Sequence, residues 1–108
     1  MDIKALNLLG IAMRAGKVAA GFSRCRDSVK SGKAALVLVC ADISAKTEKE
    51  LNFECSKSGT PLVRTDCQSS ALSAAIGFKC GVCAVLDGGF AAGLTELINR
   101  NERIDTDL

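Results

Sequence analysis

Two runs of continuously apolar residues constrain the fold of this chain most strongly. Residues 35–40 read ALVLVC and residues 82–86 read VCAVL, and neither run contains a charged side chain. Side chains alternate between the two faces of a strand, so a strand that is apolar throughout is buried on both faces. We therefore expect a central sheet that is covered by a layer of helices on each side.

Segments with helical spacing of apolar residues separate these strands, and glycines or polar caps mark their ends. Ser44 is a favourable helix N-cap, and Gly16, Gly59 and Gly77 each follow the last residues of a helix. The expected helices begin at Ile3, near Phe22, after Ser44, near Gln68 and before Phe90, and the expected strands cover residues 18–20, 35–40, 62–64 and 82–86. This alternation predicts an α/β fold, a three-layer α/β/α sandwich with helices on both faces of the sheet.

The length of 108 residues predicts a single domain, residues 1–108, with a polar tail that frays from about Asn101. The longest apolar run, residues 34–41, is far shorter than the ~20 residues that cross a bilayer. The opening residues, MDIKALNLLG, lack the basic and long apolar regions of a signal peptide. Because the six cysteines also lie mostly among apolar neighbours, we predict a cytoplasmic protein with reduced thiols.

The chain contains no His, Trp or Tyr. A catalytic triad with a His base is therefore excluded, and zinc loses its usual nitrogen ligand. Cys80 and Cys83 form the one C-x-x-C motif, but it enters a strand instead of opening a helix, so its thiols are expected on opposite faces of the sheet. We predict no enzyme activity, no cofactor and no metal site. A thiol or metal protein built on these two cysteines remains a third hypothesis.

Charge is distributed unevenly along the chain. The first 33 residues contain seven Lys or Arg against two Asp, whereas residues 86–108 contain two Arg against five carboxylates. Residues 17–33 combine cations with a glycine turn and a helix start, which suits phosphate groups, and the loop 77–80 adds a cation and an aromatic side chain. From these residues alone, an RNA-binding surface and an ordinary solvated face fit equally well.

Three segments of the sequence, taken together, nevertheless resemble a single protein family. They are AGKVAAGFSRCRDSVKSGKAALVLVCADIS at 15–44, GTPLVRTD at 59–66 and ALSAAIGFKCGVCAVLDGGFA at 71–91. Together they resemble the kink-turn RNA-binding ribosomal-protein family, and LLGIAMRAGKVAAG and DGGFAAGLTELI fit its short bacterial branch. The resemblance extends from about Ile3 to Arg100 and depends on the order of all the pieces.

This resemblance implies a mixed four-stranded sheet and a non-catalytic scaffold that binds a sharply bent RNA duplex with tandem sheared G·A pairs. In the family, the turn after the first strand enters the groove, and a loop before the last strand covers a flipped-out nucleotide. The residues that correspond here are Gly21, Phe22, Ser23 and Arg24, followed by Arg26, and then Phe78, Lys79 and Cys80 in the covering loop. The charge pattern adds Lys17, Lys30 and Lys33 as phosphate contacts.

Three positions depart from the family pattern. Strong kink-turn binders carry Asn and Glu where this chain has Ser23 and Arg24, and a Lys where it has Asp27. Arg24 cannot accept from a guanine amino group, but an Arg binds guanine O6 and N7, or a phosphate. Asp27 repels phosphate unless Arg24 or Arg26 pairs with it. We expect a monomer that binds structured or ribosomal RNA, in association with the ribosome and away from membranes; the alternative is a protein-interaction module whose RNA binding is weakened or lost.

Overall fold

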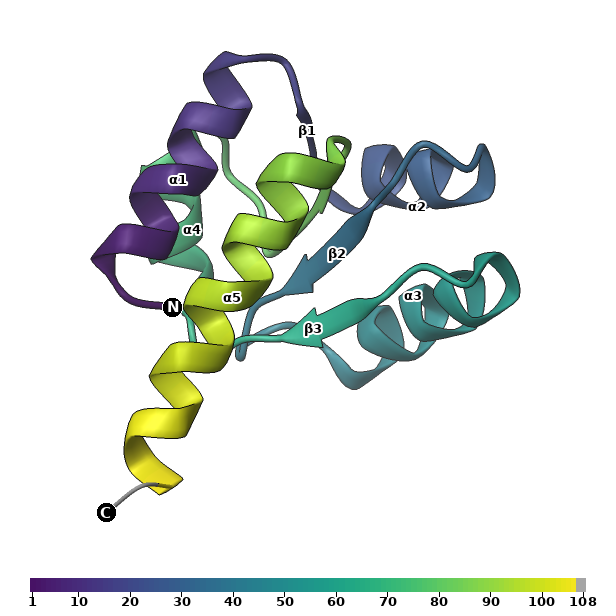
Figure 1. The fold of residues 1–108 in the computed structure, drawn as a ribbon. Helices are drawn as coiled ribbons and strands as arrows, with labels where there is room; N and C mark the ends of the chain where they lie inside the picture. Colours follow the sequence, from purple (N-terminus) through teal and green to yellow (C-terminus); the bar gives the residue numbers. More distant parts are fainter. Residues whose placement is uncertain (107–108) are drawn as a thin grey trace.

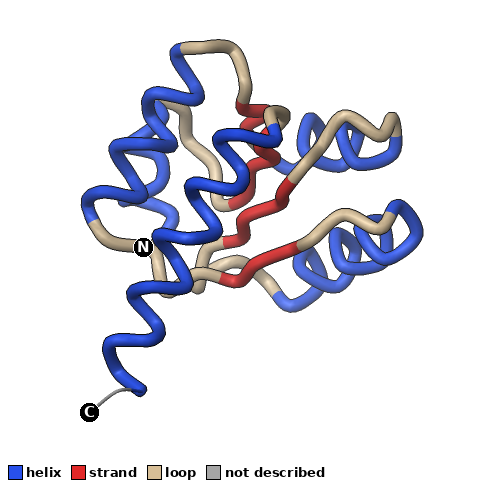
Figure 2. The backbone as a smooth tube through the Cα atoms, viewed as in Figure 1, coloured by secondary structure: helices blue, strands red, loops and turns tan. Residues whose placement is uncertain are grey.

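A computed structural model describes the backbone of residues 1–106 and the side chains of residues 1–100. Helices and strands alternate along the chain (Figures 1 and 2). The helices are α1 (Ile3–Arg14), α2 (Phe22–Lys30), α3 (Ala45–Ser58), α4 (Ser69–Ile76) and α5 (Gly88–Thr106). The strands are β1 (Val18–Ala20), β2 (Leu36–Val39), β3 (Leu62–Arg64) and β4 (Val82–Val85). The expected alternation is therefore confirmed.

The strands form one mixed sheet in the order β1-β4-β2-β3. β4 lies antiparallel to both of its neighbours, with Ala19 opposite Ala84 and Val37 opposite Ala84 on the other side. β2 and β3 run parallel, and α3 makes the crossover connection that a parallel pair needs. β1 and β4, which begin far apart in the sequence, thus lie side by side. This pairing positions the candidate site described below.

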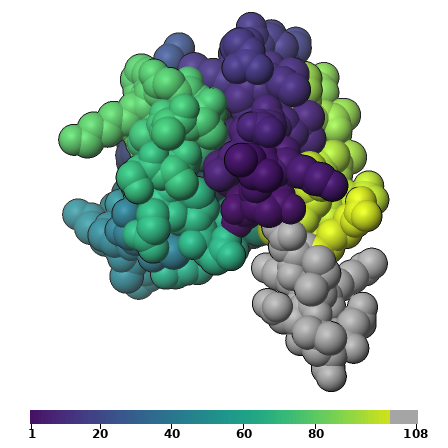
Figure 3. Space-filling view, turned by 90° about the vertical axis from the view of Figure 1, so that its left-hand side faces the viewer, coloured from purple at the N-terminus to yellow at the C-terminus, as the bar shows by residue number. Residues whose placement is uncertain are grey.

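Both faces of the sheet are buried under helices. Figure 1 shows α1, α4 and α5 on one face and α2 and α3 on the other. Leu36 and Leu38 pack into the cluster under the first group, while Val37 and Val39 pack into the cluster under the second. In the space-filling view of Figure 3, α1 (purple) lies between α4 (green) and α5 (yellow-green). The three-layer α/β/α sandwich with a mixed four-stranded sheet is confirmed.

Local caps determine where the helices begin and end. The Asp2 carboxylate accepts from the backbone N–H of Ala5 at 3.0 Å, and the Ser44 hydroxyl accepts from that of Thr47 at 3.1 Å. Gly59 and Gly77 end α3 and α4 in the left-handed conformation, with φ of 71° and 72°. These boundaries agree with the sequence expectation because each depends only on a few neighbouring residues.

The tail from about Asn101 was predicted to fray. Its side chains lie outside the described residues, and residues 107 and 108 lie outside them entirely. The backbone of α5 is described through Thr106. Among the described residues, no helix has both the length and the apolar character needed to cross a bilayer.

Candidate functional site

The two segments that the sequence selected meet at one edge of the sheet. We call this surface the turn edge and define it as residues 21–24 together with 78–81. β1 ends beside the start of β4, with Ala20 opposite Cys83, and the N–H of Gly21 donates to the carbonyl of Val82 at 3.0 Å. Segments separated by more than fifty residues are therefore held together by the sheet itself.

The Gly21 turn presents backbone donors outward. Gly21 has φ 94° and ψ 162°, a conformation restricted almost entirely to glycine, although no atom within 4 Å would meet an added Cβ. It is the N-cap of α2, and no side chain caps the first turn. The N–H groups at the start of α2, with the positive end of the helix dipole, are thus available to an anion.

The covering loop is anchored from α4. The Ser73 hydroxyl accepts from the N–H of Cys80 at 3.1 Å and donates to the carbonyl of Cys80 at 3.2 Å. Burial raises the pKa of the Cys80 thiol, while hydrogen bonds from the backbone of Gly21 and Val82 act in the opposite direction. Cys80 therefore lies against the Gly21 turn. Phe78 and Lys79 are exposed beside it, and 46% of Phe78 is accessible.

A hollow of about 590 Å³ adjoins this loop. Serine hydroxyls and the covering loop line it: Ser69, Ser70, Ser73, Lys79, Cys80 and Gly81. The Asp42 carboxylate accepts from both the hydroxyl of Ser69, at 2.6 Å, and its N–H, at 2.9 Å. The Ser69 hydroxyl lowers the pKa of Asp42 most, so this carboxylate stays ionised and fixes the start of α4.

The cations on α2 face two directions. Arg24 is exposed on the first turn, beside Ser23. Arg26 lies over the ring of Phe22, 5.3 Å from its centroid, and its Nε atom is 3.6 Å from the Asp27 carboxylate. Of the two arginines that could pair with Asp27, Arg26 does so, in an exposed contact. It leaves Arg24 as the arginine at the turn edge itself.

The structure does not bring the three predicted lysines Lys17, Lys30 and Lys33 to the turn edge. The carbonyl of Lys17 accepts from the N–H of Leu86 at 2.8 Å, and Lys33 lies just before β2, so both adjoin the far end of β4. We call residues 17 and 33 the lysine edge. Four residues of β4, at ~3.3 Å each, separate the two edges by roughly 10–13 Å. Lys30, at the end of α2, lies 3.4 Å from the Glu54 carboxylate instead.

The expectation that the thiols of Cys80 and Cys83 lie on opposite faces is wrong. Cys80 packs against the same apolar cluster as Cys83, on the side of α1, α4 and α5. Alternation applies only within a strand, and Cys80 precedes the first residue of β4. Among the described residues, no group of three or more His, Cys, Asp or Glu side chains is placed to hold a metal ion.

An exposed aromatic side chain on α3, Phe53, was not among the residues predicted from the sequence. Phe53 is 64% exposed on α3, at the side of a hollow between α2 and α3. The helix buries Leu51 and Cys55, four residues apart, so position 53 lies on the opposite side of the same helix. That spacing is the sequence signal that would have identified an outward-facing aromatic side chain.

The fold and the site define a class of protein: a three-layer α/β/α module with an uncapped glycine turn and an aromatic loop gathered at one sheet edge. This chain belongs to the ribosomal protein L7Ae/L30e/S12e/Gadd45 family, whose model matches residues 4–95. The family resemblance that the sequence strings indicated is thereby confirmed, and it fits a short bacterial branch.

Known proteins of similar sequence and structure agree with this assignment. RNA-binding protein YlxQ of Enterococcus faecium is 34% identical over 95 residues, which are 88% of this chain and 91% of that protein. Large ribosomal subunit protein eL30 of Eremothecium gossypii is 30% identical over 91 residues, covering 82% of this chain and 87% of its own. The solved structure of a protein of unknown function from Bacillus halodurans has a TM-score of 0.84 and 31% identity, over 91% of this chain and 99% of that one.

Proposed function

We propose that this protein is a non-catalytic RNA-binding protein and that the turn edge is its RNA-binding surface. One observation carries the proposal: the sheet joins the Gly21 turn and the loop 78–81 through the hydrogen bond from Gly21 to Val82. The names of the relatives from Enterococcus faecium and Eremothecium gossypii, an RNA-binding protein and a ribosomal subunit protein, support RNA as the ligand.

We propose further that the RNA is a bent duplex of the kink-turn type. The Gly21 turn allows the backbone to approach the widened groove closely, and the first N–H groups of α2 donate to phosphate or base oxygens. The Arg24 guanidinium replaces a carboxylate reader by donating to guanine O6 and N7, or to a phosphate. Phe78, half-exposed, covers an unstacked base, with Lys79 beside it for the adjoining phosphate.

Under this proposal the chain works as a monomer in the cytoplasm, on structured or ribosomal RNA. Lys17 and Lys33 lie at the opposite edge and contribute long-range attraction more than contact. Burial raises the pKa of all six cysteine thiols, which disfavours the thiolate form and any thiol chemistry.

Fluorescence anisotropy tests the proposal with two labelled duplexes. One is a standard kink-turn, and the other has Watson–Crick pairs in place of its G·A pairs; each is titrated at two salt concentrations. We expect tighter binding to the first, and we expect Arg24→Glu to weaken it at least tenfold, because a cation at the groove becomes an anion. The matched control is Arg14→Glu, an exposed arginine at the end of α1.

Each outcome separates the alternatives. Equal and steeply salt-dependent binding to both duplexes would keep RNA as the ligand and remove kink-turn specificity. Equal losses in the Arg24 and Arg14 variants would remove the turn edge as the contact surface. Absence of binding to either RNA would overturn the proposal in favour of a protein-interaction module.

A further inference from the structure

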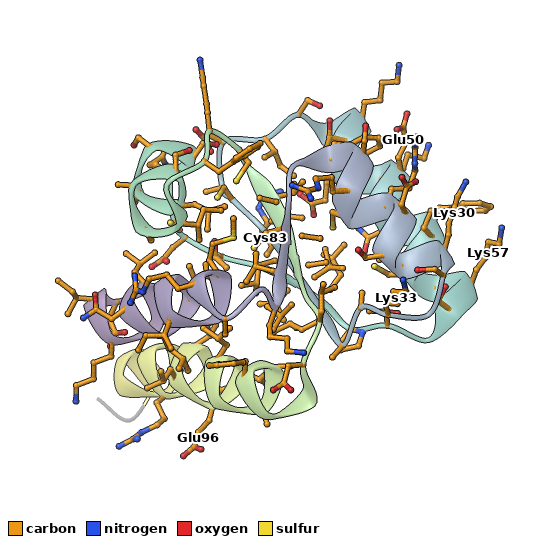
Figure 4. All side chains as sticks on the ribbon, turned by 90° about the horizontal axis from the view of Figure 1, so that it is seen from above. Lys30, Lys33, Glu50, Lys57, Cys83 and Glu96 are labelled. Carbon is orange, nitrogen blue, oxygen red and sulfur yellow. The ribbon has the colours of Figure 1, made fainter. Side chains whose placement is uncertain are left out.

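A second hollow, of about 360 Å³, lies on the outer surface between α2 and α3 and outside the turn edge. Its lining residues come from both helices: Arg26, Lys30, Lys49, Glu50, Phe53 and Glu54. Figure 4 shows Lys30 and Lys57 side by side on this surface, with Glu50 further along it. The volume falls within the range of sites that bind small molecules or single side groups.

Phe53 is the distinctive side chain of this hollow. It is 64% exposed, more than Phe78, and the Nζ atom of Lys57 lies over its ring, 5.2 Å from the centroid. Lys49 and Lys57 precede and follow it by four residues, so the three form one stripe along α3, with ~6 Å between successive members. Lys49 lines the hollow and Lys57 does not, so the hollow lies on the Lys49 side of the ring.

The acidic groups of the hollow are largely compensated. Glu54 is only 8% exposed and forms part of its base, 3.4 Å from the Lys30 ammonium and 3.7 Å from that of Lys57. The two lysine side chains are themselves exposed, and their ammonium groups reduce the negative charge that this carboxylate presents to an incoming anion. Three cations, Arg26, Lys30 and Lys49, line the hollow against the two carboxylates of Glu50 and Glu54, so its net charge does not oppose a phosphate.

The side chains of this stripe favour nucleic acid over protein as the occupant. Lysine is depleted at protein–protein interfaces, where arginine and aromatic residues are enriched. An exposed aromatic ring flanked by flexible cations is instead the arrangement that binds single-stranded nucleic acid, because bases stack on the ring and phosphates meet the cations. Lys49 and Lys57 each lie about one helical turn from the ring, so phosphates on both sides of a base stacked there would lie near a cation.

The hollow is linked to the turn edge through Arg26. Arg26 lines it and lies over the ring of Phe22, which directly follows Gly21. α2 and α3 both begin at the end of the sheet where β1 and β2 finish, so their shared groove leads away from that edge. A strand of RNA that leaves the turn edge along α2 therefore passes over Arg26 into this hollow.

We propose that the hollow between α2 and α3 is a second RNA site, which takes an unpaired nucleotide flanking the bent duplex: its base stacks on Phe53, and Lys49 and Arg26 contact its phosphates. The inference depends on the proposed function only in taking RNA as the ligand. Its contact residues are separate from the turn edge, so the two can fail independently.

The test uses the full-length, ¹⁵N-labelled protein and a single-stranded hexamer of adenosine nucleotides, followed by NMR. We expect hexamer-induced shifts in amides of α2 and α3 around the hollow. Phe53→Ala should weaken hexamer binding about tenfold, since removal of a stacking platform costs most of one base contact, and Lys49→Gln by a few fold. The controls are Ile3→Ala and Lys4→Gln, an exposed apolar and an exposed cationic change on α1, which should leave hexamer affinity unaltered.

A kink-turn duplex with and without a three-nucleotide single-stranded extension separates the two proposals. The extension should strengthen binding by the wild-type protein and give no gain with Phe53→Ala, which keeps its affinity for the blunt duplex. Hexamer shifts without any duplex binding would support this site and overturn the turn edge. Duplex binding with no hexamer shift, or with equal shifts in Phe53→Ala, would overturn this site; a protein partner for α2 and α3 would then be the alternative.

Discussion

The two ends of β4 carry similar charge but different backbones. The turn edge has Arg24 and Lys79, and the lysine edge has Lys17 and Lys33; all four side chains are exposed. Both edges contain glycines with positive φ: Gly21 at 94° at the turn edge, and Gly16 and Gly32 at 75° and 76° beside the two lysines. They differ in that the turn edge has a helix start without a side-chain cap and a half-exposed Phe78. The comparison teaches that cation count does not separate the edge proposed to bind RNA from the opposite one, whereas the uncapped helix start and the aromatic side chain do.

The largest effect expected from this comparison concerns two glycines. A Cβ on Gly81, at the turn edge, would lie 2.7 Å from Cγ2 of Ile43 and 2.9 Å from Oγ of Ser69. Gly81→Ala should therefore lower the free energy of unfolding by about 1–3 kcal/mol. Gly88→Ala, next to the lysine edge at the start of α5, meets no atom within 4 Å and should change it by less than ~0.5 kcal/mol. Urea unfolding measures both, and equal values would show that the turn edge is not closely packed.

A smaller effect is expected from a matched pair of lysines. Lys79→Glu places an anion at the turn edge, and it should weaken RNA binding about tenfold, or ~1.4 kcal/mol, and reduce the salt slope by about one. Lys17→Glu makes the same change at the lysine edge and should alter affinity less than threefold. Anisotropy at two salt concentrations compares them. A larger loss in the Lys17 variant would reverse the assignment of the two edges.

The smallest effect is a difference in thiol reactivity. Burial raises the pKa of Cys80, and it raises that of the fully buried Cys83 well above its usual value. A raised pKa means less thiolate at neutral pH, so both should react more slowly with iodoacetamide than a free cysteine, and faster as the pH rises. Mass spectrometry should find Cys80 labelled before Cys83, and bound RNA should slow the labelling of Cys80. If Cys83 were labelled before Cys80, the position described here for the loop 78–81 would be wrong.

Local signals in the sequence predicted the elements well. Ser44 and Gly59 delimit α3, and the apolar runs at 35–40 and 82–86 correspond to β2 and β4, because caps and burial act over a few residues. The order of the strands depends on contacts between distant segments. The family resemblance implied a mixed four-stranded sheet but not the order of its strands, and no periodicity within a single segment carries that order.

The candidate site was predicted only in part. The sequence paired the Gly21 turn with the loop 78–81, and the structure brings them together. It also grouped Lys30 and Lys33 with that turn because they are close in sequence. The nine residues of α2 extend ~13 Å, which carries both lysines away from its first turn. The number of charges along a stretch of sequence does not indicate how far apart those charges lie in the folded protein.

The hydrogen bond from Gly21 to Val82 has a consequence for how recognition is shared between protein and ligand. It ties the turn to a strand at the centre of the sheet, so the two segments of the turn edge already lie together in the unbound protein. A preorganised surface loses little conformational freedom on binding. If the turn edge binds bent RNA as proposed, the nucleic acid must supply the bending, and RNAs that are already kinked in solution should associate fastest.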